Sequence, residues 1–140
     1  MIYQVVNTET GDVRFLNGTD LLLDDCPNFT VQEFASKDGN EIVLFKPSIV
    51  RVAQSIRDKV GVPIKLNSAF RTYTHNKAVG GADGSKHPLG EALDFDTPEG
   101  MTTEQFLIEI LLTIGNNYGI GLYESFVHVD DRGYSAFWRG

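Results

Sequence analysis

Cysteine, histidine and basic residues are all scarce in this chain. The 140 residues include one cysteine and three histidines. Cys26 can form no disulfide within the chain and has no CxxC partner for metal or redox chemistry, so we expect a packing residue. The net charge of −7 and the pI near 4.8 argue against a phosphate-binding surface, because nucleic-acid-binding proteins concentrate Lys and Arg on one face. We therefore expect no nucleic-acid partner.

Long apolar segments are also missing. The longest such stretch, FLIEILLTIG at 106–115, is interrupted by Glu109 and is too short to span a bilayer. The first residues, MIYQVVNTETGD, have neither the basic start nor the apolar centre of a secretory signal. The sequence therefore predicts no membrane partner and synthesis in the cytoplasm without a signal peptide.

The composition that remains is typical of a globular domain. Hydrophobic residues make up 41% and charged residues 22% of the chain, and no repeat of fixed period is present. A chain of 15.5 kDa is the size of one domain with one core. We expect a single domain over residues 1–140, favour a monomer, and divide the chain into an N-terminal hairpin extension at 1–27 and a core at 28–140.

Capping signals and hydrophobic periodicity place the helices and strands. Thr30 and Glu33 have the spacing of a capping box, as do Thr102 and Gln105. A longer helix is expected from Pro47 to the stop signal at Gly61. Strands are expected at 2–6, 12–16, 62–70, 91–96, 119–123, 125–130 and in the tail at 132–140. Helices and strands intermingle without regular βαβ alternation, which favours an α+β fold with helices on one side of a sheet.

Two of the histidines stand near aspartates in extended segments. On a strand, His128 and Asp130 point to the same face. If the 91–96 strand lies nearby, His87, Asp94 and His128 converge into a ligand set typical of catalytic zinc, with Gly90 and Ala92 providing the turn and the space. Spacing alone leaves a second interpretation open, in which His87 is a surface loop residue and Asp94 accepts backbone hydrogen bonds. For His75 we expect a capping or surface role.

A polar, Gly-rich segment at 71–85 separates the strands expected at 62–70 and 91–96, with one helical turn expected at 74–79. Loops of this length are often functional. Arg71, at the start of the loop, is a candidate anchor for a substrate carboxylate or an ordinary salt-bridged arginine. Glu124 is a candidate turn residue or a proton-transfer group near His128.

Three segments in fixed order carry a family resemblance: SAFR at 68–71, SKHPLGEALD at 85–94 and FVHVD at 126–130. Together they resemble the zinc D-Ala-D-Ala carboxypeptidase family of metallopeptidases, whose fold is shared with hedgehog domains. The family pattern S-x-H-x-x-G-x-A-x-D is met without a gap. The resemblance extends from about residue 28 to the end of the chain, including Trp138.

The resemblance implies a hedgehog/DD-peptidase-like α+β domain, with an antiparallel sheet, flanking helices and a single Zn²⁺ site at His87, Asp94 and His128. Arg71 and Ser85 would face the substrate. The implied activity is hydrolysis of a peptide bond in bacterial peptidoglycan stem peptides or cross-links, as an endopeptidase or a D,D-carboxypeptidase. An endolysin or tail-associated enzyme encoded by a phage, acting at the cell wall, fits this expectation.

The sequence departs from the family at the general base. Some relatives carry an acid three residues before the last metal ligand, where this chain has Ser125. The catalytic acid is therefore open between Asp130 and Glu124, and support of the zinc site is the other candidate role for Asp130. Two rival functions remain: a non-catalytic zinc-containing structural or binding module, and a dipeptidase acting on free D-Ala-D-Ala.

Overall fold

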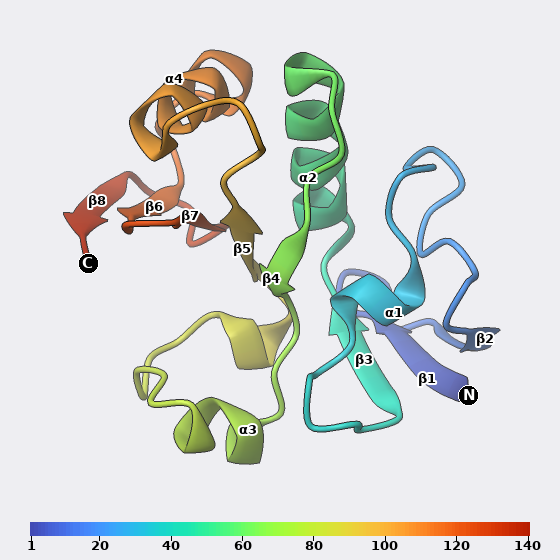
Figure 1. The fold of residues 1–140 in the computed structure, drawn as a ribbon. Coiled ribbons are helices and arrows are strands. Elements are labelled where there is room, and N and C mark those ends of the chain that lie inside the picture. The colour runs from blue at the N-terminus through green and yellow to red at the C-terminus, as the bar shows by residue number, and fades with distance from the viewer.

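The computed structural model describes residues 1–140, which form four α-helices, one 3₁₀ turn and eight strands (Figure 1). In chain order the elements are β1 (Ile2–Asn7), β2 (Val13–Asn17), α1 (Val31–Phe34), β3 (Ile42–Phe45), α2 (Pro47–Val60), β4 (Leu66–Ser68), α3 (Tyr73–Ala78), η1 (His87–Leu89), β5 (Ala92–Asp96), α4 (Thr103–Ile114), β6 (Gly119–Leu122), β7 (Phe126–Asp130) and β8 (Ala136–Arg139). This mixture confirms the predicted α+β class.

The strands form two sheets, in the orders β2-β1-β3 and β4-β5-β7-β6-β8. Most neighbours are antiparallel, but β1 with β3 and β6 with β8 are parallel pairs. The expected single antiparallel sheet is thus replaced by two mixed sheets. In the larger sheet the reason is the chain path: β7 reverses the direction of β6, β8 reverses it again, and β8 then pairs with the outer edge of β6.

Local signals account for the helix ends. Capping boxes at Thr30 and Thr102 open α1 and α4 as predicted. Gly61 ends α2 in the left-handed conformation, with φ 73°. Phe29 packs edge-on against Phe34 with ring centroids 6.2 Å apart, as expected of a hydrophobic staple.

Three strands differ from the prediction, and one of them is the tail strand expected at 132–140, which covers only Ala136–Arg139. β3 was not predicted, because IVLF is a short apolar run without the alternation of a half-buried strand. The expected strand at 62–70 shortens to three residues. Beyond it, Phe70 donates its amide proton to Phe34 and Arg71 donates to His87, so the chain leaves the sheet to join α1 and η1.

Helices α2 and α4 cover one face of the five-stranded sheet (Figure 1), as the sequence predicted. Leu93 and Phe95 of β5 are fully buried on this face, and Phe95 meets Phe106 of α4 with ring centroids 6.3 Å apart. The buried cluster of 27 residues also includes Tyr3 and Val5 of β1, so the N-terminal hairpin shares the core. The boundary after residue 27 stays a prediction.

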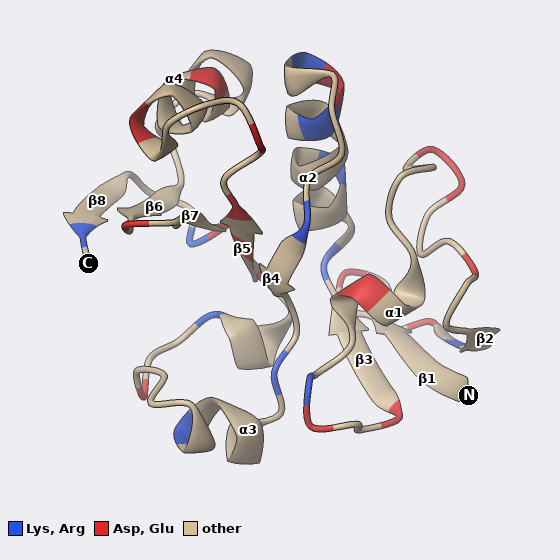
Figure 2. Cartoon of the chain, in the orientation of Figure 1, with Lys and Arg blue, Asp and Glu red and all other residues tan.

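The opposite face of the same sheet is polar. Asp94 lies on β5 between Leu93 and Phe95, whose side chains face the core. The antiparallel register places Asp94 opposite His128 of β7. Along the chain as a whole, acidic and basic residues are interspersed (Figure 2). None of the helices has the length and hydropathy that a membrane span requires.

Gly90 should be intolerant of a side chain. Its φ is 72°, and an added Cβ would lie 2.6 Å from the backbone oxygen of Leu44. Gly61 has a similar φ with no neighbour within 4 Å, so Gly61→Ala reports the conformational cost alone, about 1 kcal/mol. We expect Gly90→Ala to lower the free energy of unfolding by at least about twice that amount, measured by urea denaturation. Equal losses for both variants would contradict the predicted clash.

Cys26 should be inert in the folded protein, as its predicted packing role requires. The side chain is 1% exposed, and burial, with a smaller effect of Asp25, raises the pKa of the Cys26 thiol to about 11. The unfolded chain loses this proton near pH 8.5, so the thiol's contribution to stability is lost as the pH rises from there through about 11. We expect a steeper alkaline decline in unfolding free energy for the wild type than for Cys26→Ala, and fast labelling by a thiol reagent only in denaturant.

Candidate metal centre

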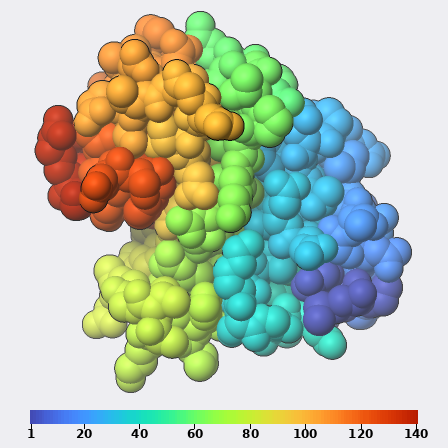
Figure 3. All heavy atoms as spheres, viewed as in Figure 1, coloured from blue at the N-terminus to red at the C-terminus, as the bar shows by residue number.

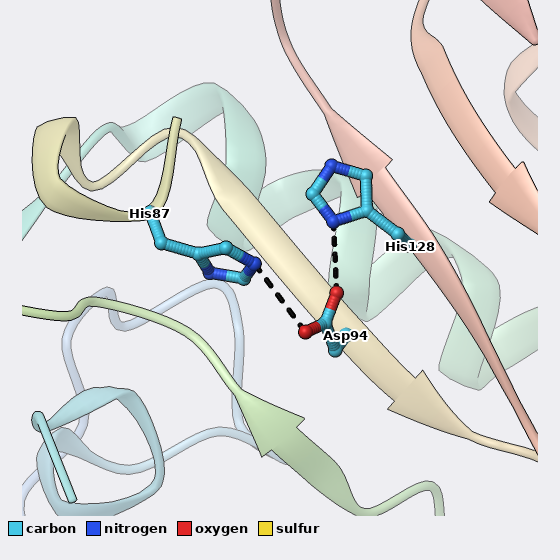
Figure 4. Close-up of side chains that lie close together, drawn as sticks. All are labelled: His87, Asp94 and His128. Atoms are coloured by element: carbon cyan, nitrogen blue, oxygen red, sulfur yellow. Dashed lines mark hydrogen bonds and ion pairs between the residues drawn. The ribbon is translucent and has the colours of Figure 1, made fainter. Parts of the chain in front are cut away.

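Three side chains from separate elements converge on the polar face of the sheet: His87, Asp94 and His128 (Figure 4). Each offers one ligand atom, and these atoms lie within 4.8 Å of one another. The register of β5 with β7 sets the Asp94 and His128 positions. The turn η1 brings in His87, which is 2% exposed.

His87 is held by hydrogen bonds on three of its atoms. Its amide donates to Ser85 Oγ, and its carbonyl accepts from the Arg71 amide. The ring Nδ1 lies 2.6 Å from the carbonyl oxygen of Ala69. A carbonyl can only accept, so Nδ1 carries the proton. The other ring nitrogen, Nε2, is then directed toward Asp94 Oδ2, 3.4 Å away.

His128 is fixed between two aspartates. Its Nδ1 lies 2.8 Å from Asp94 Oδ1, and its Nε2 lies 2.8 Å from Asp130 Oδ2. Asp130 is 1% exposed and accepts two hydrogen bonds of 2.7 Å from Arg132. Asp130 therefore meets the side of the imidazole that faces away from Asp94, where it holds the Nε2 proton.

The surroundings of these groups favour positive charge beside Asp94. Burial opposes ionisation of Asp94, but hydrogen bonds from His128 and His87 hold its pKa well below the ordinary range. Burial likewise opposes protonation of His128, yet hydrogen bonds to Asp130 and Asp94 raise its pKa above the ordinary value. For Asp130, the effect of burial is outweighed by Arg132 and His128, which keep the pKa low.

This donor set fits a zinc ion. With His87 Nδ1 and His128 Nε2 held by Ala69 and Asp130, the other nitrogen of each ring faces the Asp94 carboxylate; that nitrogen donates a proton to Asp94 or, once this proton is displaced, offers its lone pair to a metal ion. Lone pairs directed at a carboxylate are stabilised by a shared proton or by a cation. Two imidazole nitrogens and one carboxylate oxygen form a ligand set of catalytic zinc sites, which keep a fourth position open.

The three residues lie in a cavity of about 470 Å³. One wall is the Gly-rich segment from Gly80 to Lys86, and the other carries the aromatic rings of Tyr123, Phe126 and Trp138. In Figure 3 the yellow-green segment that contains α3 lies next to the red C-terminal strands. The cavity is therefore built between these two parts of the chain.

Arg71 lines the cavity, and the chain itself binds all three of its nitrogens. The Nε donates to Ser68 at 2.9 Å, Nη1 to Asn76 at 3.2 Å and Nη2 to Asp94 at 3.2 Å. Arg71 is thus salt-bridged, as the second sequence interpretation expected, and its role as an anchor for a substrate carboxylate stays a prediction. Two of the five guanidinium N–H groups stay free for a substrate oxygen.

The remaining predicted residues are divided between the cavity and the surface. Ser85 and Asp130 line the cavity. Glu124 is exposed in the turn before β7 and does not line the cavity. Sequence reasoning missed Arg132, although it continues the two-residue step of His128 and Asp130.

A pair of histidines and an aspartate that line one cavity are the kind of residue group that can hold a single metal ion. A protein-family model described as peptidase M15 matches residues 27–130. The chain belongs to this family of zinc-dependent, D-Ala-D-Ala carboxypeptidase-like metallopeptidases, which confirms the predicted resemblance. No curated protein matches the sequence. The family match ends at Asp130, so Arg132 and Trp138 complete the cavity from outside the matched residues.

Zinc binding should depend on these residues in a graded way. We expect the wild type to bind one zinc ion and Asp94→Asn and His128→Ala to bind none under the same conditions. Asp130→Asn should weaken binding by about ten- to a hundred-fold, because only the orientation of His128 is affected. His75→Ala, on α3 and outside the cavity, is the control. Calorimetric titration measures all four variants, and unchanged affinity in Asp94→Asn would exclude this metal site.

Proposed function

We propose that this protein is a zinc-dependent peptidase that hydrolyses a peptide bond in bacterial cell-wall stem peptides or cross-links. The observation that carries the proposal is the convergence of His87, Asp94 and His128 at the floor of a cavity in a peptidase M15 member. The activity is that of an endopeptidase or a D,D-carboxypeptidase. Action at the cell wall fits an endolysin or a tail-associated enzyme of a phage.

The chain's own residues would bind and orient the substrate. A zinc ion in such a site lowers the pKa of water towards neutrality and polarises a carbonyl group. Arg71 lies beside the ligand set, 3.2 Å from Asp94, and its free N–H groups would hold a substrate oxygen in register with that site. Ser85, whose oxygen accepts from the His87 amide, retains its hydroxyl proton for donation to the substrate.

Asp130 is the better placed of the two candidate acids. It lines the cavity, whereas Glu124 is exposed outside it. Both oxygens of Asp130 already accept hydrogen bonds from Arg132, and Oδ2 also pairs with His128. We propose that orienting His128 is its task in the resting enzyme, and that proton transfer by Asp130 requires exchange of one of these bonds for a water contact.

A non-catalytic zinc-containing module is the second candidate function. Ser125 stands where some relatives have an acid, and Asp130 is committed to Arg132 and His128. Such a protein would bind zinc and cell-wall peptides without cleaving them. The peptidase and the non-catalytic module would therefore both bind zinc and cell-wall peptides, and only the peptidase would cleave the peptides.

Digestion of purified peptidoglycan, followed by mass spectrometry of the released peptides, tests the activity and identifies the bond. We expect release by the zinc-loaded wild type and by His75→Ala, and loss of release after chelation. His87→Ala should lack both bound zinc and activity, because one of three ligands is removed.

Two results would exclude the peptidase assignment. Activity of a zinc-free His87→Ala protein would show that cleavage does not use this site. A wild type that binds zinc and peptides but releases nothing, over a range of peptidoglycan types, would establish the binding module instead.

A further inference from the structure

Three cations line the cavity, and two of them are neutralised by the chain. Arg71 pairs with Asp94 at 3.2 Å, and Arg132 pairs with Asp130 at 2.7 Å. Both aspartates of the cavity are thus matched by an arginine. The third cation is Lys86.

Lys86 makes no ion pair and no side-chain hydrogen bond, although it is half-buried. Acidic side chains are plentiful in this chain of net charge −7, and the other half-buried lysine, Lys46, pairs with one of them, Asp131, at 2.9 Å. A lysine that lines a cavity without a partner retains all three N–H donors of its ammonium group for a ligand.

The backbone of Lys86 is fixed beside the metal centre. Its carbonyl oxygen accepts from the amides of Leu89 and Glu91, at 3.1 and 3.2 Å. The residue precedes η1 directly and is the neighbour of His87, one of the three ligand residues. Lys86 therefore lines, from a fixed backbone position, the same cavity that would hold the scissile bond.

We propose that Lys86 binds a free carboxylate of the substrate and thereby selects peptides that carry this group next to the scissile bond. The inference rests on the proposed peptidase function. The carboxylate has two sources in a stem peptide, the C-terminus and the free carboxyl group of the D-Glu residue. An ammonium group pairs with either source through the same charge-assisted hydrogen bond.

The only tryptophan, Trp138, lines the cavity, so its fluorescence reports binding directly. The probes are the stem peptide L-Ala-D-Glu-L-Lys-D-Ala-D-Ala and two analogues, with a carboxamide at the C-terminus or at the free carboxyl group of D-Glu. Zinc-loaded wild type, Lys86→Met and Lys86→Arg are titrated with each peptide, and Kd is read before product accumulates. Lys77→Met is the matched control, because Lys77 is exposed on α3 and outside the cavity.

We expect the wild type and Lys77→Met to bind the acid about tenfold or more tightly than one of the two amides, and that amide identifies the source. Lys86→Met should bind all three peptides alike, at the affinity of that amide, and Lys86→Arg should restore the preference. The inference is overturned if the wild type shows no preference, if Lys86→Met keeps it, or if Lys86→Met weakens all three peptides equally.

Failure of the peptidase function has a different signature. The same samples, analysed later by mass spectrometry, would then show intact peptides, while the preference for the acid and its dependence on Lys86 persist in the fluorescence titration. Carboxylate recognition would then belong to a binding module.

Discussion

The site depends on the antiparallel register between β5 and β7, which sets Asp94 opposite His128. Side chains alternate along a strand, so a slip by one residue would turn Leu93 and Phe95 into the cavity and both polar residues into the core. Leu93, Phe95, Val127 and Val129 are fully buried against α2 and α4. The hydrophobic free energy of that face therefore maintains the geometry of the polar face.

Charge is balanced locally around this register. Asp94 and Asp130 are largely buried, and an unpaired buried carboxylate would cost several kcal/mol. Each of these aspartates is paired with an arginine and with the imidazole of His128. The ring of His128 connects the two pairs. Because Asp130 holds the Nε2 proton of this ring, the Nδ1 atom of His128 faces Asp94 and the rest of the ligand set. The rigidity of the centre thus arises from the same ion pairs that make its burial tolerable.

The sequence predicted those features that depend on local chemistry. Capping boxes located α1 and α4, and two-residue alternation brought His128 and Asp130 to one face. Features set by long-range packing were not predictable: β3 pairs with a strand far along the chain, and β8 passes β7 to reach β6. The H-x-D spacing also does not predict which imidazole nitrogen Asp130 meets, because that depends on how Arg132 packs over the neighbouring strand β6.

The space for that packing comes from missing side chains on β6. A Cβ at Gly119 would collide with Arg132 and Asp130, and one at Gly121 would lie 2.6 Å from Trp138 Nε1. These glycines leave room beside β6 for the ion pair and the indole, which line the cavity. The chain's net charge of −7 repels anionic peptides at a distance, but salt screens that repulsion beyond about 8 to 10 Å. If the protein acts on such peptides as proposed, discrimination among them would come from short-range contacts inside this cavity.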